Sequence, residues 1–131
     1  MKRAVILTLP ILLSACATTT SVAAPPQLAG TAWTFITIDG ARPASSRASL
    51  RFEGDRVSAT AGCNGLGGTW RIDKGQLIGG PYVSTMMFCD GLMEQERALA
   101  ALLEEEPSVQ RNGNRLTPTS ASHTAELLMA D

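Results

Sequence analysis

The sequence predicts an α+β fold that is mostly antiparallel β: a small curled sheet or barrel of about eight short strands with one inserted helix. Short runs of alternating apolar and polar residues recur between Gly, Asp and Asn turn residues. One segment near residue 100 instead places its apolar residues at helical spacing. The 116 residues from Cys16 onward suffice for one domain with a core and are too few for two.

The clearest strand signal is a hairpin over residues 49–61. Apolar and polar residues alternate on both sides of Gly54-Asp55, which supplies a two-residue turn. Late insertion of a helix among many short strands favours an antiparallel barrel or a strongly curled sheet. The expected strands, in chain order, are 32–38, 49–53, 57–61, 69–72, 76–78, 82–87, 108–111, 115–119 and 124–129.

One helix is expected between Asp90 and Pro107. Asp90 is predicted to cap it, and Glu94 and Glu96 lie early, where the helix dipole favours negative charge. The apolar stripe of this helix should lie over an opening in the sheet. The acidic run 104–106 is unfavourably placed, since acids at a helix C-terminus oppose the dipole.

The N-terminus predicts export and lipidation. Lys2 and Arg3 precede an apolar run of ten residues, 4–13, which is far short of the ~20 needed to span a bilayer. Small residues then lead to Cys16, so residues 1–15 are typical of a lipoprotein signal peptide. The alternative is plain export with cleavage after Ala24. Residues 16–27 lack charge and apolar periodicity and are expected to be a flexible tether, with the domain spanning 28–131.

The charge balance excludes nucleic acid as a partner. Removal of residues 1–15 takes two of the eleven basic residues and none of the twelve acidic ones, so the formal net charge goes from −1 to −3. No basic stripe is visible that could neutralise phosphates. Membrane contact is therefore expected through N-terminal acyl chains alone, with an envelope protein as a possible further partner.

Cys63 and Cys89 remain once Cys16 is lipidated. A pair of cysteines in an oxidising compartment favours a disulfide, with two free thiols as the alternative. A zinc site would need four ligands, and His123 is the only histidine. No metal, no cofactor and no catalytic residue is predicted. His123 lies in an expected loop, where a solvated side chain is the ordinary outcome.

Two further motifs receive structural interpretations. The glycine-rich segment 62–68 lacks the spacing of a phosphate-binding loop and precedes a strand, so it is predicted to be a wide bend. Met86, Met87 and Met93 surround Cys89 and are expected to fill gaps in the core, with a promiscuous binding surface as the alternative.

Five elements of the chain match a known family: Leu28–Trp33, Ile38–Gly40, Gly62-Cys63-Asn64, Thr85–Cys89 with Met86, and Glu94. Through these elements the chain resembles the META-domain family, whose members include HslJ-like heat-shock lipoproteins. The resemblance covers about residues 28–129. It implies a small, mostly antiparallel β fold with one helix, a cell-envelope role linked to stress, and no enzymatic mechanism. It also implies one patch of family-motif residues in which Cys63 and Cys89 are joined.

The expected function is a non-enzymatic, lipid-anchored cell-envelope protein that serves as a binding or assembly module in stress adaptation. The alternative is a carrier of a small apolar ligand or lipid within the barrel. Ala17 is not the aspartate that commonly retains lipoproteins in the inner membrane. The periplasmic face of the outer membrane is therefore the expected location.

Overall fold

A computed structural model describes residues 16–17 and 24–131 of the chain. The expected signal peptide, 1–15, and the tether residues 18–23 lie outside the described residues. No helix in the described ranges is long and apolar enough to cross a membrane.

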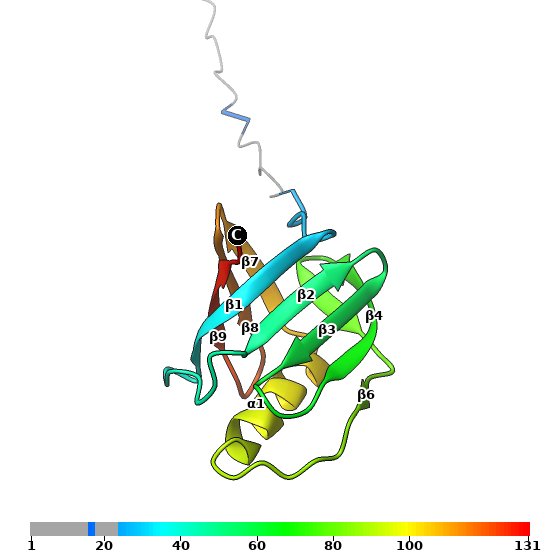
Figure 1. Cartoon of the computed structure of the whole chain (residues 1–131). Coiled ribbons are helices and arrows are strands. Elements are labelled where there is room, and N and C mark those ends of the chain that lie inside the picture. The colour runs from blue at the N-terminus through cyan, green and yellow to red at the C-terminus, as the bar shows by residue number, and fades with distance from the viewer. Residues whose placement is uncertain (1–15, 18–23) are drawn as a thin grey trace, which may run out of the picture.

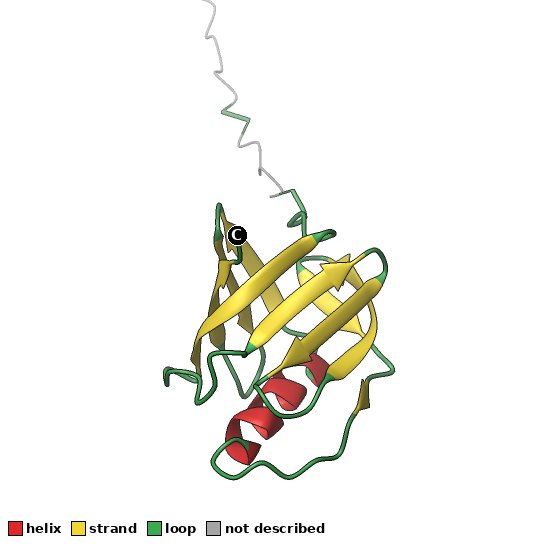
Figure 2. Ribbon diagram, viewed as in Figure 1, coloured by secondary structure: helices red, strands yellow, loops and turns green. Residues whose placement is uncertain are grey.

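Eight antiparallel strands close into a barrel, and a helix lies across one of its ends (Figures 1 and 2). This confirms the predicted fold class. In chain order the elements are β1 (Thr31–Ile38), β2 (Ser49–Glu53), β3 (Arg56–Thr60), β4 (Leu66–Asp73), β5 (Gln76–Gly79), β6 (Val83–Ser84), α1 (Met93–Glu104), β7 (Ser108–Asn112), β8 (Arg115–Thr119) and β9 (Ala125–Met129). The sheet order is β3-β2-β1-β9-β8-β7-β5-β4, and pairing of β3 with β4 closes the circle. The two-residue strand β6 pairs with the first residues of β4.

The barrel interior is filled by the chain's own side chains. In the predicted hairpin, β2 and β3 turn at Gly54-Asp55 and bury alternate residues, as a half-buried antiparallel pair should. The rings of Phe52 and Trp70 pack edge to face, with 4.8 Å between their centroids. An interior packed in this way gives the ligand-carrier alternative no support. The largest fully buried side chains are Trp33, Phe52, Leu28, Leu50, Leu77, Leu102, Leu103, Leu116, Leu127, Val57, Pro107 and Pro118.

The helix α1 covers one open end of the barrel, as its apolar stripe predicted (Figure 1). Its buried residues are Ala98, Leu99, Leu102 and Leu103. Full burial of one leucine side chain stabilises a fold by about 2 kcal/mol. The stripe therefore fixes α1 firmly to the barrel end.

The predicted helix cap at Asp90 is wrong. The helix begins later, with Leu92 at the N-cap position and no side chain bonded there. The Leu92 N–H donates to the Cys89 carbonyl (3.2 Å), and Gly91 has a φ of 76°. This extra turn separates Asp90 from the first helical amides. Glu94 and Glu96 do lie in the first turn of α1.

The segment before β1 closes the opposite end of the barrel. Leu28 is 1 % exposed, and its carbonyl accepts a hydrogen bond from the Thr31 N–H (3.1 Å). The Arg111 guanidinium lies 5.3 Å from the centroid of the Trp33 ring and donates to the Gln27 carbonyl. Residues 24–28 thus join the barrel at the end away from α1 (Figure 1).

Two predictions near β4, one of a bend and one of a strand, need correction. The predicted bend 62–68 is shorter, because β4 already begins at Leu66. The predicted strand 82–87 is reduced to β6, because beyond it the chain pairs with a side chain rather than with a strand. The ring of Tyr82 packs on glycines in β4 and β5, and a Cβ at Gly79 would overlap its hydroxyl.

Candidate functional site

A disulfide joins Cys63 and Cys89, which confirms the prediction for this pair. Their sulfur atoms are 1.91 Å apart and their Cα atoms 6.0 Å apart. The bond ties the bend that follows β3 to the segment that precedes α1, 26 residues further along the chain. The two Cys-containing motifs therefore form one site.

The side chain of Asn64 holds the extended residues that follow β6. Its Nδ2 donates to the Met87 carbonyl (3.0 Å), and its Oδ1 accepts from the Met87 N–H (2.7 Å). The same Oδ1 accepts from the Thr85 hydroxyl (2.9 Å). Asn64 is 7 % exposed, the only buried polar or charged residue among those described. Only an amide offers a donor and an acceptor side by side at this length, so the contacts explain why asparagine stands here.

Glu96 fastens the same bend to α1. Its Oε1 accepts from the backbone N–H groups of Cys63 (2.9 Å) and Asn64 (3.0 Å). The family resemblance placed Glu94, not Glu96, in the family-motif patch, but side chains two residues apart differ by about 200° around a helix and so point to different faces. Glu94 instead lines a cavity of about 210 Å³ beside the end of β1, together with residues such as Asp39.

Gly62 lets the bend approach a neighbouring loop. Its φ is 119°, a conformation that favours glycine, and a Cβ there would overlap the side chain of Ser45. The Gly62 carbonyl accepts from the Arg47 guanidinium (2.8 Å). The three residues of the Gly-Cys-Asn motif thus have different roles. Gly62 allows close approach to the loop of Ser45, the next residue forms the disulfide, and Asn64 bonds to the Met87 backbone.

The residues held by these contacts are exposed, and four of the six are apolar. We call Val83–Phe88 the 83–88 segment; all six of its residues are exposed. Val83 is 74 % exposed, Met86 93 %, Met87 57 % and Phe88 79 %. The expectation that Met86 and Met87 fill the core is wrong. Their side chains point outward because the backbone of the segment is used to pair with Gly65 and Asn64.

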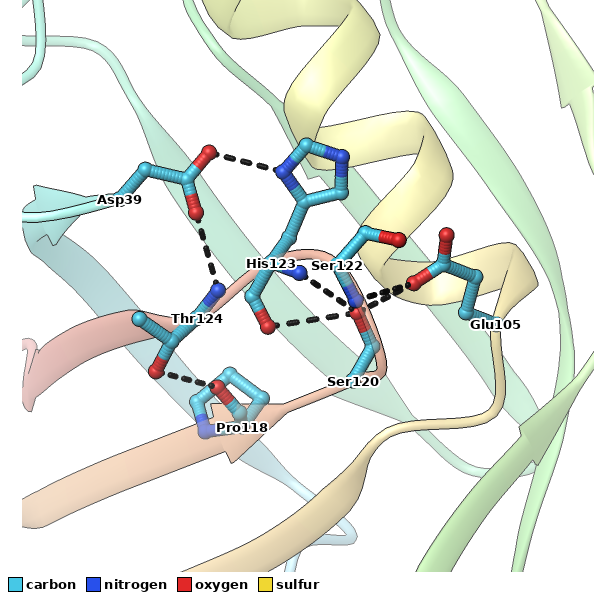
Figure 3. A network of polar contacts seen from close by, with 7 residues as sticks. All are labelled: Asp39, Glu105, Pro118, Ser120, Ser122, His123 and Thr124. Atoms are coloured by element: carbon cyan, nitrogen blue, oxygen red, sulfur yellow. Dashed lines mark hydrogen bonds and ion pairs between the residues drawn. The ribbon is translucent and has the colours of Figure 1, made fainter.

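A second polar cluster lies at the loop before β9 (Figure 3). His123 Nδ1 is 2.8 Å from Asp39 Oδ2, and Asp39 Oδ1 accepts from the Thr124 N–H (3.0 Å). Glu105 Oε2 accepts from the Ser120 hydroxyl (2.6 Å) and the Ser122 N–H (3.1 Å). The expectation of a solvated His123 is therefore wrong, since its side chain is 25 % exposed and paired.

This cluster is a structural latch. Its carboxylates are occupied by the backbone and side chains of one loop, which they hold against β1 and the end of α1. Ser120 Oγ accepts from the His123 backbone N–H (3.0 Å) rather than from the ring, so the contacts do not form a nucleophile–base pair. Hydrogen bonding from Ser120 lowers the pKa of Glu105. These hydrogen bonds stabilise the charge of Glu105, and so explain how one of the three acids at 104–106 is tolerated at the helix C-terminus.

The latch predicts an acid-dependent contribution to stability. Burial raises the pKa of Asp39, but hydrogen bonds from Thr124 and His123 outweigh it, and the pKa lies below the ordinary 3.8. Asp39 therefore stabilises the fold fully above about pH 4, and this contribution is lost as the pH falls through the lowered pKa. We expect the difference in unfolding free energy between wild type and Asp39→Asn, measured with urea from about pH 5 to about pH 2.5, to shrink below about pH 4. A difference that stays constant would contradict the assignment.

A sequence model of the META domain matches residues 26–131. The chain belongs to the META domain family. No curated protein matches the sequence. The META match begins two residues before the buried Leu28 and covers the whole barrel and α1.

Solved structures show the same fold. One NMR structure is 24 % identical in sequence, covers 83 % of this chain and 97 % of its own, and has a TM-score of 0.73. A second NMR structure, of a protein from Burkholderia xenovorans, is 19 % identical, covers 93 % of this chain and 99 % of its own, and has a TM-score of 0.64.

The site in this META domain is thus a set of contacts that hold the 83–88 segment and leave its side chains exposed. The bend 62–64, the disulfide and Glu96 are brought together, and Met86 is displayed on the segment they hold, whereas Glu94 lies elsewhere. Neither the family nor these neighbours give a sign of catalysis. Sequence reasoning missed Glu96 and the Asp39–His123 pair. The helical phase of residue 96 could have indicated the first, but nothing local indicates a pair 84 residues apart.

Proposed function

We propose that this META domain is a lipid-anchored, non-enzymatic binding module of the bacterial cell envelope, and that the 83–88 segment is its binding surface. The observation that carries the proposal is a rigidly held, exposed apolar segment at the α1 end of the barrel. Monomeric proteins rarely leave adjoining large apolar side chains exposed without an interaction to serve. The disulfide, Asn64 and Glu96 keep the segment in place before a partner arrives.

The position of the segment suits an anchored protein. Residues 24–28 meet the barrel at the end away from α1 (Figure 1). A chain anchored through Cys16 would therefore present the 83–88 segment away from the membrane. Acyl chains would supply the attachment, because two or more hold a protein stably without basic residues.

The remaining functional assignments depend on the family and on the leader. The META resemblance supports a role in stress adaptation without chemistry of its own. In the described ranges, no group of three or more His, Cys, Asp or Glu side chains could hold a metal ion. Ala17 after the lipidated cysteine supports the periplasmic face of the outer membrane.

Fractionation tests the anchor. We expect the wild-type chain in the outer-membrane fraction and Cys16→Ser in the soluble periplasmic fraction, because the thiol is the acylation site. The matched control Ala17→Asp keeps the thiol and should move the protein to the inner membrane. Immunoblots of separated fractions measure both results. Retention of Cys16→Ser in the outer-membrane fraction would refute anchoring through this residue.

A further inference from the structure

The 83–88 segment is bonded to the domain along one edge only. Val83 faces Gly67 as a hydrogen-bonded antiparallel pair, and the Thr85 N–H donates to the Gly65 carbonyl (3.1 Å). The Met87 N–H and carbonyl pair with the Asn64 side chain. Alternate residues 83, 85 and 87 thus turn their backbone groups toward the barrel.

The residues that alternate with them, 84, 86 and 88, turn their backbone N–H and C=O groups toward solvent. In an antiparallel strand, consecutive residues direct their N–H and C=O groups to opposite sides. β6 itself ends at Ser84, but the pairing of residues 83, 85 and 87 continues the same alternation, which leaves the backbone groups of Ser84, Met86 and Phe88 directed away from β4. Within the described residues, the structure shows no hydrogen-bond partner for their three N–H groups. The 83–88 segment is thus an open, strand-like edge, of which only β6 (Val83–Ser84) is regular strand, and the backbone groups of Ser84, Met86 and Phe88 are unpaired along it in the part of the chain that the structure describes.

This edge lacks the side chains that usually protect one, although β6 itself is only two residues long. Natural proteins shield exposed edges with charged side chains, proline or a covering element. Residues 82–89 contain no charged residue and no proline. The large apolar side chains of Met86 and Phe88 are 93 % and 79 % exposed.

We propose that the 83–88 segment binds an extended, uncharged segment of another protein by strand addition. The partner's backbone pairs with Ser84, Met86 and Phe88, and its apolar side chains pack on Met86 and Phe88. This mode supplies affinity through main-chain hydrogen bonds and specificity through alternate side chains. The inference rests on the proposed binding function and states how the partner is recognised.

The geometry favours a different protein over this chain itself. Residues 24–28 lie at the opposite end of the barrel, so they do not cover the edge (Figure 1). A second copy paired antiparallel across this edge would direct its residues 24–28 the opposite way. Two copies anchored in one membrane face do not satisfy that arrangement without bending back on their tethers.

Amide hydrogen exchange of the mature, lipidated protein in detergent tests the free edge first. We expect slow exchange at Val83, Thr85 and Met87 and fast exchange at Ser84, Met86 and Phe88. The probe for binding is a nine-residue synthetic peptide of alternating valine and threonine with a lysine at each end. It should slow exchange at the three fast amides. The same peptide N-methylated at alternate residues should not slow their exchange, because one edge of that peptide lacks backbone N–H donors.

Two substitutions at Met86 separate backbone pairing from side-chain contact. Met86→Pro removes an N–H that has no hydrogen-bond partner within the described residues, at a position that is not among those with positive φ. The fold should therefore persist, and peptide affinity should fall about tenfold or more. Met86→Gln keeps the N–H and should weaken binding less. Urea unfolding of both variants checks that their stability is unchanged.

Four outcomes would overturn the inference: uniform exchange along the segment, no binding of the unmethylated peptide, equal losses for the two Met86 variants, or a dimer in sedimentation whose edge amides are already protected. None of these bears on membrane anchoring, which the Cys16→Ser fractionation tests separately.

Discussion

Replacing both Cys63 and Cys89 with alanine is expected to lower the free energy of unfolding by about 3 kcal/mol. The disulfide closes a loop of 26 residues, and the loss of chain entropy in the unfolded state stabilises such a fold by roughly 3.5 kcal/mol. The bonds from Asn64 and Glu96 remain in the variant and hold part of the loop. Urea unfolding of the mature chain measures the change.

The matched control for this variant is Cys16→Ser, which removes the third cysteine and leaves the disulfide intact. It should unfold like wild type, whereas wild type treated with a reductant should unfold like the double alanine variant. A double variant within about 0.5 kcal/mol of wild type would show that the cross-link does not stabilise the fold.

The strands that the sequence predicted well are those whose pattern is local. The hairpin at Gly54-Asp55 was predictable because period-2 alternation and turn chemistry lie within a dozen residues. The apolar stripe of α1 likewise specified its buried face. The pairing of Cys63 with Cys89 followed from counting cysteines rather than from geometry.

The contacts that make the site were not predictable in the same way. Asn64 bonds to Met87 across 23 residues and replaces a strand partner with a side-chain amide. Because a side chain takes the place of a neighbouring strand, the expected strand ends after Ser84, and the methionines beyond it are exposed rather than buried. The pattern of apolar residues along the chain does not show that a distant side chain forms the hydrogen bonds a neighbouring strand would otherwise form.

The same limit applies to charged residues. The acid at position 105 opposes the helix dipole locally, yet Ser120 and Ser122 bond to it from a distant loop. Asp90 satisfies the local rule for a cap, but the turn at Gly91 places it outside the helix. Tertiary contacts decide both cases.

Gly62→Ala is the second substitution with a large expected effect, a loss of about 3 kcal/mol in the free energy of unfolding. A non-glycine residue held at positive φ costs about 1–3 kcal/mol, and forced overlap in a packed site costs a similar amount. Both apply here, because φ is 119° and a new Cβ would overlap the Ser45 side chain. The strain would reach the functional site directly, since Cys63 and Asn64 follow in the chain.

Gly65→Ala provides the matched control three residues away. A Cβ at Gly65 meets no atom within 4 Å, and its φ is not among the positive ones. Its unfolding free energy should stay within about 0.5 kcal/mol of wild type. Adding Ser45→Gly to Gly62→Ala should recover the overlap part of the loss and leave the backbone part. Urea unfolding of wild type, Ser45→Gly, Gly62→Ala and the double variant separates the two parts. Equal losses at positions 62 and 65 would show instead that the whole bend tolerates no side chain, and that the close approach to Ser45 does not govern it.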